Sequence, residues 1–300
     1  MKNLTDYDTA SLSGGPYWHL CTPGQFTELL FENEADYRFG MNSVAICAYA
    51  TGIEILTFQI MSNHLHLILA AMERICLDFF EKLKKRLRLY YSRHGRFVSL
   101  DNFCPSLIPI DNLKSLRAEI VYVNRNGFLV NPSYMPFSYP WGSGNLYFMP
   151  SFPEQACQRW KDIQYREKEK ICQGRVIVLP DNYLVHNSII LPQNYCATNK
   201  GMAMFRDAHQ YFSMVSKNYE AYSEVAKRLG DNMFLTDDEM FASLRLLSRN
   251  QYGDIKPTML APREKIELAR QMKSKYNASE GQIQRMLRLD RSVIAELFGH

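Results

Sequence analysis

Two histidines separated by a single leucine are the residues whose type and spacing point most directly to chemistry. His64 and His66 lie in the apolar run Met61-Ser62-Asn63-His64-Leu65-His66-Leu67-Ile68-Leu69. Side chains alternate between the two faces of a β-strand, so a strand here directs both imidazoles to one side and the leucines to the other. Imidazole commonly binds divalent metals, so this pair is half of a metal site. Two ordinary strand histidines are the alternative interpretation.

A tyrosine and an asparagine four residues apart are the second feature. We expect a helix over residues 113–126, ended by Gly127, and Tyr122 and Asn126 share one face of it. A phenolate beside a metal ion can attack a phosphodiester and form a phosphotyrosine. The Asn126 amide oxygen would complete the metal site, and the cation would polarise the phosphate. Taken alone, a tyrosine at this spacing is more often a core residue.

Basic side chains are concentrated on one predicted helix, over about residues 74–93. Its cations alternate with apolar residues, which is typical either of a solvated face or of a surface that contacts phosphates. The basic residues that cluster in this helix are Lys82, Lys84, Lys85, Arg86, Arg88 and Arg93.

The C-terminal residues have the outline of a helix-turn-helix unit. Pro262 begins a helix that continues to about Tyr276, and two short helices follow. The side chains expected to point inward are Ile283, Met286, Leu287, Val293, Ile294, Leu297 and Phe298. This arrangement leaves Arg285, Arg288 and Arg291 on or near the exposed side, where they could bind duplex DNA.

Composition limits the class of protein. The chain has 300 residues, 46% of them hydrophobic, and a net charge of +4, so any affinity for nucleic acid must come from local charge. Its seven cysteines form no C-x-x-C pair, which favours reduced thiols in the cytoplasm over disulfides or a cysteine zinc site. We find no signal peptide and no apolar run of the roughly 20 residues that a membrane helix needs.

The elements that would position these residues alternate between strands and helices. We expect strands over residues 17–22, 54–59 and 106–110, besides the histidine strand, and helices over residues 34–50, 74–93 and 113–126. This order predicts an α+β fold with helices over an antiparallel sheet. We divide the chain into residues 1–150, a mostly helical accessory region 151–260 without assigned chemistry, and the helix-turn-helix-like unit 261–300.

The histidine segment resembles the His-hydrophobe-His (HUH) motif of single-tyrosine transposases, especially the REP-associated tyrosine transposases. That family reads M-P-N-H-x-H-L-L, then Y-I-x-x-N-P, G-L-V and a D-Y-P-W-S-S-Y-like stretch. The corresponding segments here are Tyr122-Val123-Asn124-Arg125-Asn126, Gly127-Phe128-Leu129-Val130 and Ser138-Tyr139-Pro140-Trp141-Gly142-Ser143. The resemblance covers about residues 15–147.

The resemblance implies a ferredoxin-like catalytic domain, usually dimeric, in a cytoplasmic bacterial protein associated with the nucleoid. It implies cleavage of single-stranded DNA next to a hairpin, with Tyr122 as the nucleophile. It also implies Mg²⁺ or Mn²⁺ held by His64, His66 and Asn126. An alternative is a domesticated relative that binds structured DNA without cutting it. A relaxase is a third interpretation, but relaxases usually carry another histidine close by, and none lies near His66 in the sequence.

The chain departs from the family pattern at three points. Ser62 replaces the usual proline, no proline follows Asn126, and about four residues are missing between Asn126 and Gly127. Placing Asn124 on the family asparagine would instead put Ile120 at the nucleophile position. We prefer Tyr122, because this alignment keeps both the tyrosine–hydrophobe step and the four-residue spacing.

Overall fold

The fold is built on a four-stranded antiparallel sheet. The computed structural model describes residues 15–23, 29–130, 139–149, 153, 156–216, 237–276, 278 and 280–298. The strands are β1 (Tyr17–Cys21), β2 (Glu54–Ile60), β3 (Leu65–Ala70) and β4 (Ser106–Ile110), in the spatial order β2-β3-β1-β4. With α1 (Glu34–Thr51) and α2 (Glu73–Arg93), the chain order is β-α-β-β-α-β, which is the ferredoxin-like arrangement. The expected fold class is therefore confirmed.

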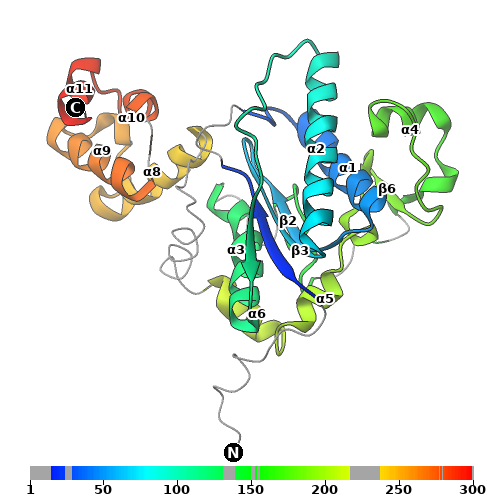
Figure 1. Ribbon diagram of the computed structural model, residues 1–300. Helices are drawn as coiled ribbons and strands as arrows, with labels where there is room; N and C mark the ends of the chain where they lie inside the picture. Colours follow the sequence, from blue (N-terminus) through cyan, green and yellow to red (C-terminus); the bar gives the residue numbers. More distant parts are fainter. Residues whose placement is uncertain are drawn as a thin grey trace, which may run out of the picture.

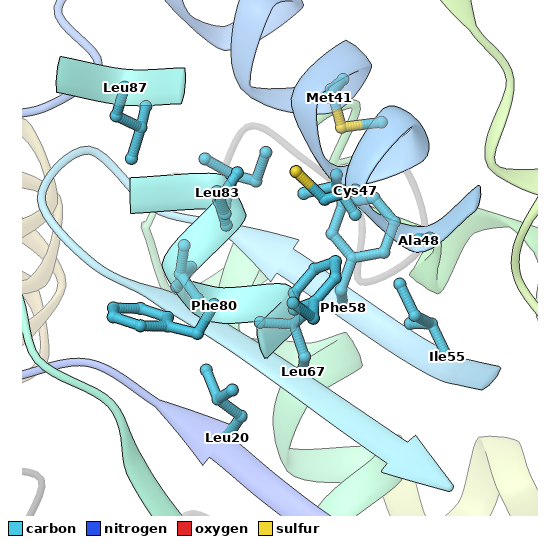
Figure 2. Packing of buried hydrophobic residues seen from close by; sticks show 14 of the residues in the cluster. Leu20, Met41, Cys47, Ala48, Ile55, Phe58, Leu67, Phe80, Leu83 and Leu87 are labelled. Carbon is cyan, nitrogen blue, oxygen red and sulfur yellow. The ribbon is translucent and has the colours of Figure 1, made fainter. Parts of the chain in front are cut away.

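The two faces of the sheet are covered by different helices (Figure 1). Helices α1 and α2 pack on one face, where Leu20 and Leu67 of the sheet meet Phe80 and Leu83 of α2 (Figure 2). Helix α3 (Leu113–Val130) packs on the opposite face together with α6 (Ala208–Ser216). The expected placement of helices on one face thus describes α1 and α2, whereas α3 forms a second layer.

Two element ends differ from the expectations. The backbone N–H of Met61 donates to the carbonyl of His64, 2.8 Å away, so His64 closes a tight turn just before β3 begins. Helix α3 does not end at Gly127 but continues to Val130. A glycine inside a helix costs only about 1 kcal/mol relative to alanine, so the helix can continue past Gly127.

Residues 156–216 pack against α1 and α3. They form a small sheet of β5 (Gln158–Arg159), β6 (Leu184–His186) and β7 (Ile189–Ile190), besides α4 (Tyr165–Cys172), α5 (Thr198–Ala203) and α6. Trp160 and Val185 pack against Ala45 and Ile46 of α1. The accessory region was expected to be mostly helical, so this small sheet is an addition. Short 3₁₀ turns occur at Gly144–Leu146, Trp160–Asp162, Pro192–Asn194 and Pro257–Met259.

The C-terminal helices form a unit with its own core. They are α8 (Asp237–Tyr252), α9 (Pro262–Tyr276), α10 (Glu280–Leu287) and α11 (Arg291–Phe298). The core contains the expected Ile283, Met286, Leu287 and Ile294, with Leu297 and Phe298 packed against it. Figure 1 shows this unit apart from the sheet, with α8 the nearest of its helices, and α8 contacts α3. Among the described residues, no helix is long and apolar enough to cross a membrane.

Candidate active site

The two histidines of the motif lie next to each other on the α3 side of the sheet. Their rings meet edge to face, with centroids 5.1 Å apart. His66 is fully buried in β3, whereas His64, in the turn, is 9% exposed. Leu65 and Leu67 pack into the opposite, apolar layer. Both imidazoles therefore lie on one side of the sheet, as expected, although His64 reaches that side from the turn and only His66 is a strand residue.

Helix α3 brings Tyr122 to this pair. The Tyr122 ring lies edge to face with His66, with centroids 5.4 Å apart, and its side chain is only 2% exposed. Asn126, one helical turn further on, is also buried. Three of the residues expected from the sequence are thus in one neighbourhood, His64, His66 and Tyr122, and Asn126 follows on the same helix.

Asn124, the alternative anchor for the family asparagine, lies in a different environment. Its side-chain oxygen accepts a hydrogen bond from Thr57, and its amide nitrogen donates to the Tyr211 hydroxyl 3.0 Å away. Its backbone carbonyl accepts from Gln59 at 3.0 Å. These contacts tie α3 to β2 and α6, so the Asn124 amide is used in packing helices and strands together.

Two residues that we did not select from the sequence complete the cluster. His19 of β1 hydrogen bonds through Nε2 to Nδ1 of His66 at 3.0 Å, and through Nδ1 to the Glu119 carboxylate at 2.8 Å. Both His19 and Glu119 are fully buried. Two signals in the sequence could have found them: a histidine inside an apolar strand, and an acid three residues before Tyr122 on the same helix face.

The protonation states suit a cation rather than an anion. Burial, together with the neighbouring His64 and His19, lowers the pKa of His66 well below its ordinary value, so its imidazole is neutral. Neutral imidazole is the metal-binding form. Nδ1 of His64 also has a partner, the Asn63 side-chain oxygen at 2.8 Å, which must accept the proton on that nitrogen. The chemistry of these donors therefore fits a divalent cation bound through Nε2 of both rings.

Two histidines do not make a complete metal site. Among the residues that the structure describes, no three His, Cys, Asp or Glu side chains are grouped so as to hold a metal ion. A further ligand would have to be an amide oxygen, such as that of Asn126, or would come with the substrate.

The second family-like motif is attached to β2 beside the histidine turn. The Tyr139 hydroxyl donates to the Ile60 carbonyl at 2.7 Å, and the Ile60 N–H donates to the Trp141 carbonyl at 2.9 Å. Gly142 then passes so close to β2 that a Cβ there would lie 2.4 Å from the Phe58 carbonyl oxygen. A residue without a side chain is required at this approach.

An aromatic stack supports the same turn from outside the sheet. Phe31, Tyr37 and Trp141 stack in sequence, with centroids 5.4 and 4.9 Å apart. The N–H of Phe31 donates to the Ser62 carbonyl at 2.8 Å, which links the stack to the turn. Tyr37 and Trp141 also line a pocket of about 570 Å³ that reaches His186.

The basic residues of α2 fall into two groups. Arg86 donates to Ser43 and to the Cys172 carbonyl, and burial lowers its pKa. Arg93 donates to the Gln173 carbonyl at the end of α4. These two arginines hold α2 to its neighbours.

Four other cations of this cluster are exposed or half-buried. They are Lys82, which pairs with Asp78, and Lys84, Lys85 and Arg88. All of them lie on the layer opposite the histidines, because α2 covers the other face of the sheet. Arg285, Arg288 and Arg291 of the C-terminal unit are exposed, as expected.

The fold and the cluster define a ferredoxin-like α+β protein with a buried histidine pair facing a helix-borne tyrosine. No protein-family model and no curated protein matches the sequence. Among solved structures, the fold is similar to that of a REP-associated tyrosine transposase bound to a REP hairpin. The alignment is 15% identical, with a TM-score of 0.35, and covers 49% of this chain and 86% of that chain.

Proposed function

We propose that the protein is an HUH-type, single-tyrosine enzyme that nicks and rejoins single-stranded or hairpin DNA. The observation that carries the proposal is the meeting of Tyr122 with the histidine pair, with ring centroids of Tyr122 and His66 5.4 Å apart. A nucleophile on a helix faces two imidazoles, one in β3 and one in the turn before it, and these are parts that metal-assisted phosphodiester cleavage needs. The motif resemblance described above supports the same assignment.

In this proposal His64, His66 and Asn126 hold Mg²⁺ or Mn²⁺. The bound cation would supply charge stabilisation at the phosphate and at the leaving oxygen. Neutral His66 and the uncharged Asn126 amide add no positive charge that would repel the metal.

Tyr122 carries the covalent step. Its phenol oxygen, after losing its proton, forms a bond to the phosphorus while the bond from phosphorus to the 3′ oxygen breaks. The released 3′ oxygen takes up a proton, and the 5′ phosphate stays on the tyrosine. Attack by a 3′ hydroxyl on this phosphotyrosine reverses the step and rejoins a strand. The chemistry consumes no external energy source, which suits strand exchange.

The recognition of DNA is divided between two surfaces in this proposal. Lys84, Lys85 and Arg88 of α2 contribute phosphate contacts to the strand or hairpin. The exposed Arg285, Arg288 and Arg291 contribute contacts to duplex DNA from the C-terminal unit. Arg86 and Arg93 are left out, because their guanidinium groups already bind backbone carbonyls of this chain. The homodimer that the resemblance implies is tested by sedimentation of the full chain.

The test is covalent capture of DNA. The full chain is incubated with labelled single-stranded DNA that carries a hairpin, in the presence of Mg²⁺ or Mn²⁺, and adducts are separated under denaturing conditions. We expect an adduct that disappears in Tyr122→Phe. Tyr147→Phe is the matched control, because Tyr147 is another buried tyrosine on this face and donates to the Leu56 carbonyl at 2.9 Å. An adduct that survives in Tyr122→Phe refutes the assignment.

One observation favours the second candidate, a relative that binds structured DNA without cutting it. Tyr122 is 2% exposed and His66 is fully buried, so DNA can reach them only if the covering groups move. Salt-dependent binding of a hairpin, with no adduct under either metal, would select this alternative.

A further inference from the structure

A line of hydrogen bonds leads from a buried carboxylate to the imidazole of His66. Glu119 of α3 bonds to Nδ1 of His19 at 2.8 Å, and Nε2 of His19 bonds to Nδ1 of His66 at 3.0 Å. The three residues come from α3, β1 and β3, and each is fully buried. The His19 and His66 rings are inclined at 64°, with centroids 5.2 Å apart.

With Glu119 ionised and His19 neutral, the line admits one arrangement of protons. A carboxylate accepts hydrogen bonds and cannot donate them, so the proton between Glu119 and His19 belongs to Nδ1 of His19. Neutral His19 then carries a lone pair on Nε2, and the proton between the two rings belongs to Nδ1 of His66. Nε2 of His66 is left as the nitrogen with the lone pair. His64 reaches the same state through Asn63, which accepts from its Nδ1 at 2.8 Å.

We propose that His19 and Glu119 are positioning residues that hold His66 in the tautomer whose Nε2 lone pair is available to a divalent cation. The inference rests on the proposed function, because it assigns these two residues to the metal site of that reaction. Metal-binding histidines typically donate their other ring N–H to a carboxylate or carbonyl, which orients the ring and makes it more basic. Here the acceptor is a second histidine, itself oriented by the carboxylate.

Stability alone does not account for this arrangement. Burying a carboxylate and two imidazoles costs desolvation that apolar residues of similar volume would avoid. Each hydrogen bond offsets part of that cost, but an apolar replacement of the whole group is often neutral or stabilising. Positioning His66 would explain why His19 and Glu119 are polar residues in a buried place.

The first test reads the tautomer directly and needs no metal. The nitrogen resonances of the histidine rings are recorded by NMR on the metal-free full chain, and His66 is assigned by His66→Gln. We expect the wild-type ring to be protonated on Nδ1, and a substantial Nε2–H population to appear in His19→Leu and in Glu119→Leu. His19→Gln should restore the wild-type state, because its amide oxygen can accept from Nδ1 of His66. An unchanged His66 tautomer in His19→Leu overturns the proposal.

The second test measures affinity for Mn²⁺ alone, by electron paramagnetic resonance of the free ion. We expect His19→Leu and Glu119→Leu to bind Mn²⁺ about 10- to 100-fold more weakly than wild type, with His19→Gln closer to wild type. Asp36→Asn is the matched control, because Asp36 is a buried acid that bonds instead to Arg96 and Tyr90, and its affinity should stay at the wild-type level.

The two tests separate the two proposals. Equal Mn²⁺ affinity in wild type and in variants whose His66 tautomer has changed overturns the positioning role. A wild-type chain that binds no Mn²⁺ through His64 and His66, while its tautomer still depends on His19, contradicts the metal site of the proposed function. The hydrogen-bonded line would then be a structural feature of the core, which also overturns its role toward a cation.

Discussion

The two faces of strand β3 differ in a way that separates folding from chemistry. On one face Leu65, Leu67 and Leu69 pack with α1 and α2 in a hydrophobic core. On the other face His66 lies among His19, Glu119 and Tyr122, while Ile68, two residues on, joins the apolar core below α3. The same six-residue strand thus contributes to a conventional core on one side and to a buried polar cluster on the other.

The comparison indicates which face of the sheet stabilises the fold. Burial of apolar surface stabilises the fold by about 25 cal/mol for each Å² removed from water, and the apolar face supplies it. Buried polar groups contribute little net free energy even when all are hydrogen bonded. We therefore expect substitutions on the apolar face to change stability, and substitutions on the polar face to change function.

The largest effect is expected on the apolar face. Phe80 of α2 is fully buried against the sheet, so Phe80→Ala should lower the free energy of unfolding by about 3–5 kcal/mol, through reduced burial and a residual cavity. Urea denaturation of the full chain measures it. Leu77→Ala, on the same helix but 39% exposed, should change stability by less than about 0.5 kcal/mol. If Phe80→Ala and Leu77→Ala lowered the free energy of unfolding by similar amounts, burial on this face would not be what stabilises the fold.

On the polar face we expect substitutions to abolish activity without lowering the free energy of unfolding. Replacing His19, His66 and Glu119 together with leucine removes every member of the hydrogen-bonded line, so no buried group loses its partner within it. The free energy of unfolding should stay the same or rise by about 1–4 kcal/mol, while the DNA adduct disappears. Denaturation and adduct formation are measured on the same preparation. A loss of stability comparable to that of Phe80→Ala would make the cluster structural and remove the contrast between the faces.

The contrast itself could be predicted only in part from the sequence. The shared helix face of Tyr122 and Asn126 follows from their four-residue spacing, which is a local property. His64 and His66 share a side as expected, although only His66 lies within the strand. The order of strands and helices likewise predicted the α+β sheet.

The partners of the histidines could not be found in the same way. His19 and Glu119 are 100 residues apart, and only the pairing of β1 with β3 and the packing of α3 bring them to His66. The small sheet of residues 158–190 was missed because strands of two or three residues are too short to show any period. Gly127 predicted a helix end, but its cost inside a helix is small enough for α3 to continue past it.

A smaller effect is expected from the charges of α2, which lie on the apolar side of the sheet. The variant Lys84→Gln/Lys85→Gln/Arg88→Gln should weaken DNA binding. The slope of the logarithm of the binding constant against the logarithm of the salt concentration should also become less steep. We expect a change of about 0.7 for each single-strand phosphate that the variant no longer neutralises. The rate of adduct formation at saturating DNA should not change, because these side chains are separated from Tyr122 by the sheet.

The comparison for the α2 variant is the triple glutamine variant of Arg285, Arg288 and Arg291. It should weaken binding to duplex DNA more than binding to single strands, since these arginines are assigned to duplex contacts. Slower adduct formation at saturation in the α2 variant would mean that this helix acts at the reactive site, despite its place on the other layer.

The smallest expected effect is a difference in cysteine reactivity between the two faces of the sheet. DNA can reach Tyr122 only if the polar face opens transiently, whereas the apolar face has no such requirement. Cys21 lies at the end of β1, opposite His66 in the strand register, and Cys47 and Cys76 lie in the apolar layer. Burial raises the pKa of Cys47 to about 12 and that of Cys76 to about 11, so both remain protonated thiols at pH 8.

Alkylation at pH 8, followed by peptide mass mapping, therefore compares the two faces in one experiment. The exposed Cys104 and the partly exposed Cys157 should react first, and the buried Cys21 next, several-fold faster than Cys47 and Cys76. Hairpin DNA should slow the reaction of Cys21 and leave the other two unchanged, because only the polar face is occupied by substrate. Equal rates for Cys21 and Cys47, with or without DNA, would mean that both faces stay closed. Tyr122 would then remain out of reach of any strand, which favours the binding protein over the enzyme.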